Sequence, residues 1–481
     1  MTRQPRRSSE ERIADALRWL ERYAPLIDDR TAFWRALESP PPIDLLVPPG
    51  RSEPDHVAAL LARRGLGVER IEWAPRHLRV TGHEGAGTLP EVVFGLAFPQ
   101  GASSSLPPRL LAPRPGERVL DLCAAPGGKT VLISSLASGR ARLLAAEPSV
   151  PRIGILIQVL ARHAVSSALV VRQDGTTFPN AGPFDAIQLD APCTGEGTFR
   201  VAAARYSPSG EQGLARSAAV QRRLLTRGLA LLAPGGRLVY STCAYAPEEN
   251  EQVISDVLAE RDDIEISPLP DDVPGAAGVT RWRGRQFHPD LSRTRRLFPH
   301  HTGSWGFFLA LLVKSARSDR IAPRRAGRPH TSPCDDPEAR EVLSRHLAER
   351  FAVGPDALDG VLVVSRGRDV WILSRMPADD HADVDLSRLD VVAPGLRALR
   401  QSGQRQRLTT AMLRWLGNSI RERVVDLDWD SAVALLRGDA TTQAPAATPA
   451  GQIAVRVGGT IVAGGFVRES RLVLEMPKAW R

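Results

Sequence analysis

The chain has 481 residues, of which 43% are hydrophobic and 24% are charged. This length predicts two to four domains, and the hydrophobic content excludes wholesale disorder. The formal net charge of +9 and the pI near 10 favour a polyanionic partner such as nucleic acid over a basic surface kept only for solubility. Four cysteines are too few for a disulfide scaffold, and the sequence shows neither a signal peptide nor a long apolar run. We therefore expect a cytoplasmic protein without a membrane span, whose thiols stay free.

The two ends of the chain predict smaller units beside a larger centre. Apolar residues at three- and four-residue spacing predict helix over residues 9–37, and a proline-rich break follows at Pro40–Pro42. A mixed stretch then completes a small N-terminal α+β module, residues 1–95. Residues 316–345 are rich in Arg, Ser, Pro and Asp without periodicity, which predicts a linker. Residues 346–481 are expected to form a second α+β region.

The centre of the chain predicts a parallel sheet. From about residue 117, apolar strands alternate with amphipathic helices, which is the pattern of a doubly wound α/β fold. We expect residues 96–315 to form one Rossmann-like domain. Its apolar run at Trp305–Val313 suits an edge or hairpin strand. The predicted strands are Arg118–Leu122, Leu143–Ala146, Ala168–Val171, Ala186–Leu189 and Arg237–Tyr240, with a predicted helix at Val150–His163 and another ending near Leu232.

A glycine-rich turn lies between the first of these strands and a helix. Its sequence, DLCAAPGGKT, spans Asp121–Thr130. Gly127 and Gly128 allow the backbone to approach a ligand, and the start of the helix offers free N–H groups. Glu147 ends the next strand, where an acid typically binds ribose hydroxyls. The spacing matches neither a dinucleotide GxGxxG motif nor a Walker loop, and the combination predicts a cofactor site of another kind.

Two cysteines end two later strands of the same predicted sheet. Cys193 closes the DAPC segment Asp190–Cys193, and Cys243 closes the STC segment Ser241–Cys243. A single cysteine is more often a small buried hydrophobic residue than a nucleophile. Two thiols at matching strand ends, beside a cofactor loop, instead favour catalysis. Cys123 has no such partner and is interpreted as packing.

These three motifs resemble those of the RNA 5-methylcytosine methyltransferases, the family that contains the bacterial RsmF and RsmB rRNA enzymes and the eukaryotic Sun-type proteins. The resemblance covers about residues 95–315 and includes Arg296–His301 and Gly306–Phe308. The segment Gly459–Phe466 is similar to the PUA-like RNA-binding domain that closes RsmF-type enzymes. Gly101 stands where the family usually has an acid, which leaves details of substrate recognition open.

The resemblance implies S-adenosyl-L-methionine as cofactor and RNA as partner, with rRNA favoured over tRNA. It also implies that residues 1–95 recognise RNA and that residues 346–481 bind RNA through a PUA-like end. No metal is expected, and we expect a monomer. The residues that the resemblance places at the methyl-donor site are Cys123, Ala124, Ala125, Pro126, Gly127, Gly128, Lys129, Glu147, Asp174 and Asp190.

The implied chemistry is attack of a thiolate on carbon 6 of cytosine, which activates carbon 5. From the residues alone, either Cys193 or Cys243 could attack, because DNA cytosine methyltransferases use a Pro-Cys pair; the resemblance assigns Cys243. Asp190 would then bind the base edge, Cys193 would assist loss of the carbon-5 proton, and Lys129 would favour the thiolate or contact the base. Two alternatives remain open: the same chemistry on tRNA, and a non-catalytic RNA-binding ribosome-assembly factor.

Overall fold

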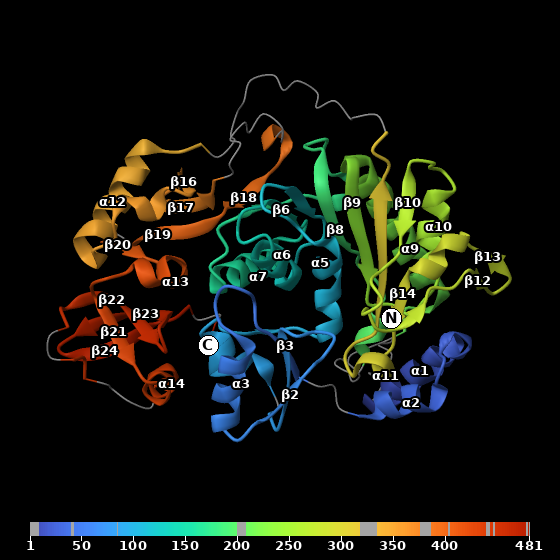
Figure 1. Ribbon diagram of the computed structural model, residues 1–481, viewed down its shortest axis with the longest axis horizontal. Helices are drawn as coiled ribbons and strands as arrows, with labels where there is room; N and C mark the ends of the chain where they lie inside the picture. Colours follow the sequence, from blue (N-terminus) through green and yellow to red (C-terminus); the bar gives the residue numbers. More distant parts are fainter. Residues whose placement is uncertain are drawn as a thin grey trace, which may run out of the picture.

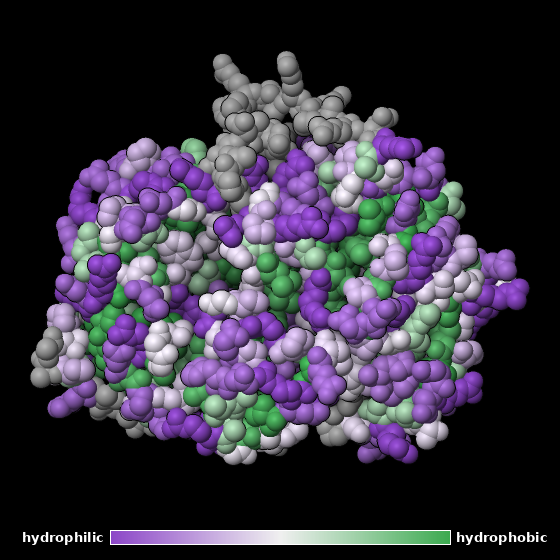
Figure 2. Space-filling model, viewed as in Figure 1, coloured by the Kyte–Doolittle hydropathy of each residue, from purple (hydrophilic) through white to green (hydrophobic). Residues whose placement is uncertain are grey.

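The structure, a computed structural model, describes residues 9–39, 43–83, 85–199, 208–317, 334–375, 386–402, 405–438, 443–445, 448–477 and 480. The predicted break at residues 40–42 and the middle of the predicted linker lie outside these ranges. Within them, no helix is both long and apolar enough to cross a membrane. Figure 1 shows a central sheet with the blue N-terminal elements below it and the orange and red C-terminal elements to its left. Hydrophilic residues cover most of this face, and hydrophobic residues form separate small areas on it (Figure 2).

A doubly wound sheet forms the centre of the molecule, as the sequence predicts. Its strands follow the order β14-β15-β9-β8-β5-β6-β7, and those from β9 to β7 are parallel. Strand order reverses at β5, which lies between β6 and β8, so ligands are expected beyond the carboxyl ends of β5 and β8. The parallel strands are β5 (Arg118–Asp121), β6 (Arg142–Ala146), β7 (Ala168–Val171), β8 (Phe184–Asp190) and β9 (Leu232–Thr242). The helices around them are α5 (Leu106–Leu111), α6 (Gly128–Leu136), α7 (Val150–Arg162), α9 (Gly210–Leu231) and α10 (Glu251–Leu258).

Burial on both faces explains why these short apolar segments are strands. Every residue of β7 is buried, as expected for parallel strands that helices cover from both sides. Strand β9 begins earlier than predicted, because Leu232 already pairs with Phe184. The predicted turn at residues 234–236 lies where the pairing of β9 with β8 shifts in register, and regular pairing continues from Arg237 with Ala186.

The apolar run that ends the central domain is an interior strand. It forms β15 (Phe307–Lys314), which pairs antiparallel with β9 on one side and with β14 and β10 on the other. The expectation of an edge strand was therefore wrong, and the hairpin alternative fits, since β14 and β15 are consecutive and antiparallel. The elements beside β15 are β10 (Ile264–Ser267), β11 (Ala276–Ala277), the β12–β13 pair (Arg281–Trp282 and Arg285–Gln286), β14 (Arg295–Leu297) and α11 (Pro299–Thr302).

The N-terminal residues form two bodies, where the sequence analysis expects one module. Helices α1 and α2 lie beside α11 (Figure 1), and Leu20, Tyr23 and Phe33 are buried in the core of the central sheet. The rest forms a separate antiparallel sheet in the order β2-β3-β1-β4, whose last strand lies beyond the predicted boundary after residue 95. The bounds are α1 (Ser9–Leu20), η1 (Glu21–Leu26), α2 (Arg30–Glu38), β1 (Ile43–Leu46), α3 (Pro54–Arg63), β2 (Gly67–Arg70), β3 (His77–Thr81), α4 (Pro90–Val93) and β4 (Phe98–Pro99).

The C-terminal region contains two four-stranded sheets, in the orders β16-β17-β19-β20 and β21-β22-β23-β24. Helix α12 (Pro337–Phe351) begins inside the predicted linker, which therefore ends before residue 337. The predicted PUA-like end coincides with the second sheet, and its likeness to a PUA domain stays a prediction. The remaining bounds are β16 (Val361–Arg366), β17 (Asp369–Ser374), β18 (Val391–Pro394), β19 (Leu396–Ser402), β20 (Arg405–Leu408), α13 (Thr410–Leu416), β21 (Val424–Leu427), α14 (Trp429–Arg437), β22 (Gly451–Val457), β23 (Thr460–Arg468) and β24 (Arg471–Glu475).

The predicted domains are joined more closely than their sequence boundaries suggest. Strand β18, from the C-terminal region, pairs antiparallel with β7 and extends the central sheet. The N-terminal sheet and the C-terminal sheets share one hydrophobic core. Within it, the buried Arg414 donates hydrogen bonds to the carbonyl oxygens of Val93, Arg162 and Val462, at 3.0, 2.8 and 2.6 Å. One side chain thus bonds to the N-terminal, central and C-terminal regions together.

Candidate active site

A cavity of about 220 Å³ lies at the carboxyl ends of β5, β8 and β9, at the reversal of strand order. Seven consecutive residues of the glycine-rich turn, Cys123 to Lys129, form one wall. Asp190 and Cys243 line it from the ends of β8 and β9, and Phe98 and Trp305 from two other segments. The structure therefore brings most of the predicted site residues to one cavity.

The glycines of the turn are required by close contacts. Gly127 has a φ of 116°, in the region that favours glycine. A Cβ at Gly128 would lie 2.6 Å from the ring of Phe98 and 3.2 Å from the amide nitrogen of Gln100. Helix α6 begins at Gly128, so its free N–H groups lie at the cavity wall.

Lys129 and Asp190 form an ion pair in the cavity wall. The Lys129 ammonium donates to Asp190 Oδ2 at 2.7 Å and to Ser104 Oγ at 2.8 Å, and it lies 5.2 Å from the centre of the Phe307 ring. Ser241 Oγ donates to Asp190 Oδ1 at 2.8 Å, so both carboxylate oxygens are bonded. Lys129 and Asp190 are among the predicted site residues, whereas Ser104 and Ser241 are not, although both serines lie in segments that match the family.

The two thiols meet as the strand ends predict. Cys193 Sγ and Cys243 Sγ are 3.2 Å apart, too far for a disulfide and close enough for a hydrogen bond between sulfurs. This bond to Cys243, together with burial, raises the pKa of Cys193 well above its ordinary value. Either sulfur can be the donor in this bond, and Cys243 also lines the cavity.

A buried carboxylate holds the loop that follows Cys193. Glu196 Oε1 accepts hydrogen bonds from the Tyr23 hydroxyl at 2.5 Å and from Trp19 Nε1 at 3.0 Å. Glu196 Oε2 accepts from the backbone N–H groups of Tyr245 and Ala246, at 2.9 and 3.2 Å. The N-terminal helical segment is thus bonded to the loops that carry both thiols. Sequence reasoning missed this link, and its only signal was an acid inside the loop motif.

The same loop also meets the Cys243 loop through main-chain bonds. Gly197 N–H donates to the Cys243 carbonyl at 2.7 Å. A Cβ on Gly197 would lie 2.4 Å from the carbonyl oxygen of Gly306, so only glycine fits there. Glu249, also buried, accepts from Thr194 N–H at 3.1 Å and from Gln221 Nε2 at 2.9 Å. Burial raises the pKa of Glu249 to about 7.

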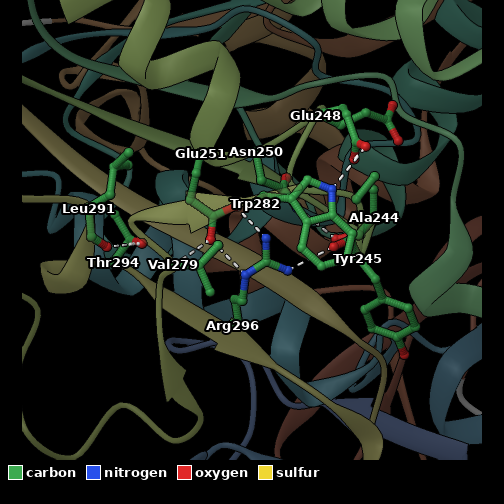
Figure 3. Close-up of polar contacts among 12 residues, drawn as sticks. Ala244, Tyr245, Glu248, Asn250, Glu251, Val279, Trp282, Leu291, Thr294 and Arg296 are labelled. Atoms are coloured by element: carbon green, nitrogen blue, oxygen red, sulfur yellow. Dashed lines mark hydrogen bonds and ion pairs between the residues drawn. The ribbon is translucent and has the colours of Figure 1, made fainter. Parts of the chain in front are cut away.

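A buried ion pair between Arg296 and Glu251 holds the segment that follows Cys243. Figure 3 shows Arg296 of β14 between Glu251 and the Tyr245 carbonyl. Arg296 Nε donates to Glu251 at 2.6 Å and Nη1 donates to the Tyr245 carbonyl at 2.7 Å, and both charged side chains are almost fully buried. The family-like segments around residues 247–251 and 296–301 therefore support the thiol loops and do not line the cavity.

Two of the predicted cofactor residues lie outside the cavity wall. Glu147 is buried at the end of β6, where it accepts from Ser149 N–H at 3.0 Å and pairs with Arg152 at 3.2 Å. Asp174 follows β7, is exposed, and accepts from Thr176 N–H at 2.8 Å. Both lie at the same edge of the sheet as the cavity, and their contact with a cofactor stays a prediction.

One group in the described part of the chain has the composition of a metal site: Asp28, His300 and His301. His301 Nδ1 accepts a hydrogen bond from the Phe298 N–H at 3.3 Å. His301 Nε2 lies 3.0 Å from Asp28 Oδ1. His300 Nε2 lies 2.8 Å from the same carboxylate. The group is a hydrogen-bonded link between the N-terminal helices and α11.

The order of the strands, the antiparallel β15 and the glycine-rich turn after the first strand define a Rossmann-like methyltransferase fold. A family model described as 16S rRNA methyltransferase RsmB/F matches residues 108–313. The chain belongs to this RNA methyltransferase family. It is 32% identical over 300 residues to the tRNA (cytosine(49)-C(5))-methyltransferase of Pyrococcus abyssi, which covers 61% of this chain and 95% of that protein.

Other similarities agree with this assignment. The chain is 35% identical over 319 residues to the 28S rRNA (cytosine-C(5))-methyltransferase of Mus musculus, covering 65% of this chain but only 40% of the mouse protein. The chain therefore spans well under half of that relative. The crystal structure of a methyltransferase homologue from Pyrococcus horikoshii superposes with a TM-score of 0.55 at 32% identity, over 63% of this chain and 99% of that one.

Proposed function

We propose that this protein uses S-adenosyl-L-methionine to methylate carbon 5 of cytosine in RNA, with rRNA as the substrate. The observation that carries the proposal is the pair of thiols, 3.2 Å apart, beside the Lys129–Asp190 ion pair in one cavity. A methyltransferase acting on an already nucleophilic atom has no use for two thiols there. Carbon 5 of cytosine is a poor nucleophile and requires covalent activation.

The cavity has features that suit the cofactor. The Gly127–Gly128 turn leaves no room for a side chain at its second glycine, and it places the start of α6 at the wall. Gln100 lines this wall, and its side-chain amide oxygen is buried without a hydrogen-bond partner among the described residues. Glu147 would bind the ribose hydroxyls once Arg152, which is half exposed, moves aside. The cofactor supplies an electrophilic methyl group on sulfur.

In the proposed reaction Cys243 attacks as a thiolate, forming a bond between its sulfur and carbon 6 of the cytosine. The electron pair of the C5–C6 double bond then becomes available at carbon 5, which takes the methyl group. Lys129, bonded to Asp190, lies near enough to the cavity to stabilise negative charge on either the thiolate or the base. Asp190 holds the base edge, and the target base must be flipped out of any stack to enter.

Release requires that carbon 5 lose its proton and that the bond between sulfur and carbon 6 break. We assign assistance in this step to Cys193, whose sulfur lies against that of Cys243. The pKa of Cys193 is raised in the free enzyme, so this thiol first gives its own proton to solvent water and then, as a thiolate, takes the proton from carbon 5. The thiolate of Cys243 leaves as the double bond forms again.

The two cysteine variants test this division of roles. Cys243→Ala cannot form the adduct, so it should be inactive and bind RNA only reversibly. Cys193→Ala should transfer the methyl group, stall before release and stay covalently joined to methylated RNA. Denaturing gel electrophoresis with labelled RNA should show a shifted band for Cys193→Ala alone. A shifted band for Cys243→Ala would reverse the assignment, and continued turnover by both variants would exclude covalent catalysis.

The choice of rRNA rests on the family description and on the rRNA enzyme of mouse. The alternative substrate is tRNA, which the name of the Pyrococcus abyssi relative gives as the molecule that it modifies. Bisulfite sequencing of total RNA from a strain lacking the gene decides between them, because the lost 5-methylcytosine lies in one RNA or the other. A non-catalytic assembly factor would leave every 5-methylcytosine in place, and the Cys243→Ala variant would then complement the deletion.

A further inference from the structure

A groove with several arginines in its lining lies between the two C-terminal sheets. Its volume is about 650 Å³, and it is bordered by α12, β20, β22 and β23. Arg350, Arg407 and Arg468 contribute positive charge to its lining. The nearby carboxylate of Glu475 lies 3.8 Å from Arg407, so this charge is partly compensated. Such a groove attracts an anionic chain.

An aromatic ring lies among these arginines. Phe466 is only half-buried, although it belongs to a central strand of its sheet. The guanidinium carbon of Arg407 lies 4.5 Å from the centre of this ring, and that of Arg468 lies 5.7 Å from it. Phe466 and Arg468 are two positions apart in β23, so their side chains point to the same face of the sheet.

The apolar area continues beyond the ring. Val473 in β24 pairs directly with Phe466, which places the two side chains next to each other on one face. Val473 is 56% exposed, one of the few large hydrophobic residues in the described chain that solvent reaches so freely. On the other side of Phe466, its partner in β22 is Gln452, whose side chain is buried and bonded to the backbone of Leu408. Phe466 and Val473 thus form a partly exposed apolar platform, and the guanidinium groups of Arg407 and Arg468 lie over the Phe466 ring.

We infer that this groove binds a single-stranded segment of the RNA substrate, with one base stacked on the Phe466–Val473 platform and flanking phosphates on Arg407, Arg468 and Arg350. This inference rests on the proposed function, because it names a second contact with the same RNA. Stacking on an aromatic ring needs an exposed base face, which a duplex hides between its base pairs. An acidic peptide could pair with the arginines but would leave the platform unused.

The test measures binding of the full-length protein to a fluorescent RNA dodecamer of mixed sequence and to its duplex, by anisotropy over a range of salt. Phe466→Ala should weaken binding of the single strand about fivefold to a hundredfold. Arg468→Gln, a change at an exposed side chain that cannot disturb the core, should weaken it and reduce the salt dependence by about 0.7 in the logarithmic slope. Arg437→Gln, at an exposed arginine on α14 outside the groove, should change neither.

Wild-type affinity in both groove variants would overturn the inference, as would an equal loss in Arg437→Gln. Displacement of the single strand by polyglutamate as readily as by unlabelled RNA would indicate a peptide site instead. Thermal melting identifies a misfolded Phe466→Ala protein, in which case Arg468→Gln decides. The two proposals can be refuted separately. Normal RNA binding by the groove variants would refute only the role of the groove. Groove-dependent RNA binding by a protein that methylates no RNA would refute only the proposed activity.

Discussion

Because Tyr23 donates a hydrogen bond to Glu196, removing the Tyr23 hydroxyl should lower the free energy of unfolding more than removing an ordinary buried hydroxyl. Tyr23→Phe keeps the ring and its packing against Tyr245, whose centre lies 6.1 Å away, but removes the donor to a fully buried carboxylate oxygen. Trp19 Nε1 would remain the only donor to that oxygen among the described residues. Hydrogen bonds to charged groups contribute about 1.5–3 kcal/mol, and the free energy of unfolding should fall by that amount.

The chain offers a matched control. Tyr240 is also fully buried, and its hydroxyl donates to the neutral carbonyl oxygen of Glu249 at 2.6 Å. Tyr240→Phe removes the same atom from a comparable site, so its cost should be about 0.5–1.5 kcal/mol, the usual range for a neutral pair. Urea unfolding of wild type and both variants measures the two losses, provided that the m-values agree. If Tyr23→Phe costs no more than Tyr240→Phe, then Glu196 is not the charged anchor of the N-terminal helix that the geometry indicates.

Two further predictions concern buried carboxylates. Glu249 titrates near 4.5 in an unfolded chain and near 7 in the folded protein, so between these values only the folded protein holds the proton, and its stability falls as the pH rises. Glu249→Gln should remove a pH-dependent loss on the order of 3 kcal/mol between pH 4.5 and 7, seen in denaturation midpoints; an unchanged pH profile would contradict the assignment. Glu147→Ala should weaken binding of S-adenosyl-L-methionine in calorimetry, whereas exposed Asp262→Ala, remote in sequence from the turn, should not. Equal affinity in the Glu147 variant would remove this residue from the cofactor site.

The central sheet could be predicted because its strands are apolar runs that helices cover on both sides. Each apolar run predicts a strand from its own residues alone. Because parallel strands end at a common edge of the sheet, Cys193 and Cys243 are then expected to lie close together. The same reasoning located the turn at Gly127–Gly128. Glu147 was placed by analogy with other nucleotide sites, and the structure shows it bonded to Ser149 and Arg152 beside the cavity, not in its wall.

Long-range contacts could not be predicted in this way. Trp19 and Glu196 are separated by 177 positions, and nothing near either residue signals the other. Helix α12 was different, since Ala339, Leu343 and Leu347 recur at every fourth position and are buried. The composition of the preceding segment hid this stripe, so residues 337–345 of the helix were assigned to the linker.

Strand β18 joins the C-terminal region to the central sheet. Its four residues end in Pro394 and form a strand only because β7 offers an edge to pair with. Deleting residues 346–481 would therefore remove part of the central sheet and half of a shared core, and it would not isolate a role in RNA binding. Substitutions inside the groove avoid this difficulty.

The pairing of β18 with β7 also has a consequence for how the protein is made. Pro394 pairs with Leu169, so more than two hundred residues are translated between the two strands. At about 5–20 residues per second, the edge of β7 emerges roughly 10–45 s before its partner exists. An apolar strand with unpaired N–H and C=O groups can recruit other chains during that interval. The nascent protein is thus most prone to aggregate after its catalytic half has been synthesised and before β18 has emerged. A chaperone that covers the edge of β7 on the ribosome should therefore raise the yield of folded enzyme.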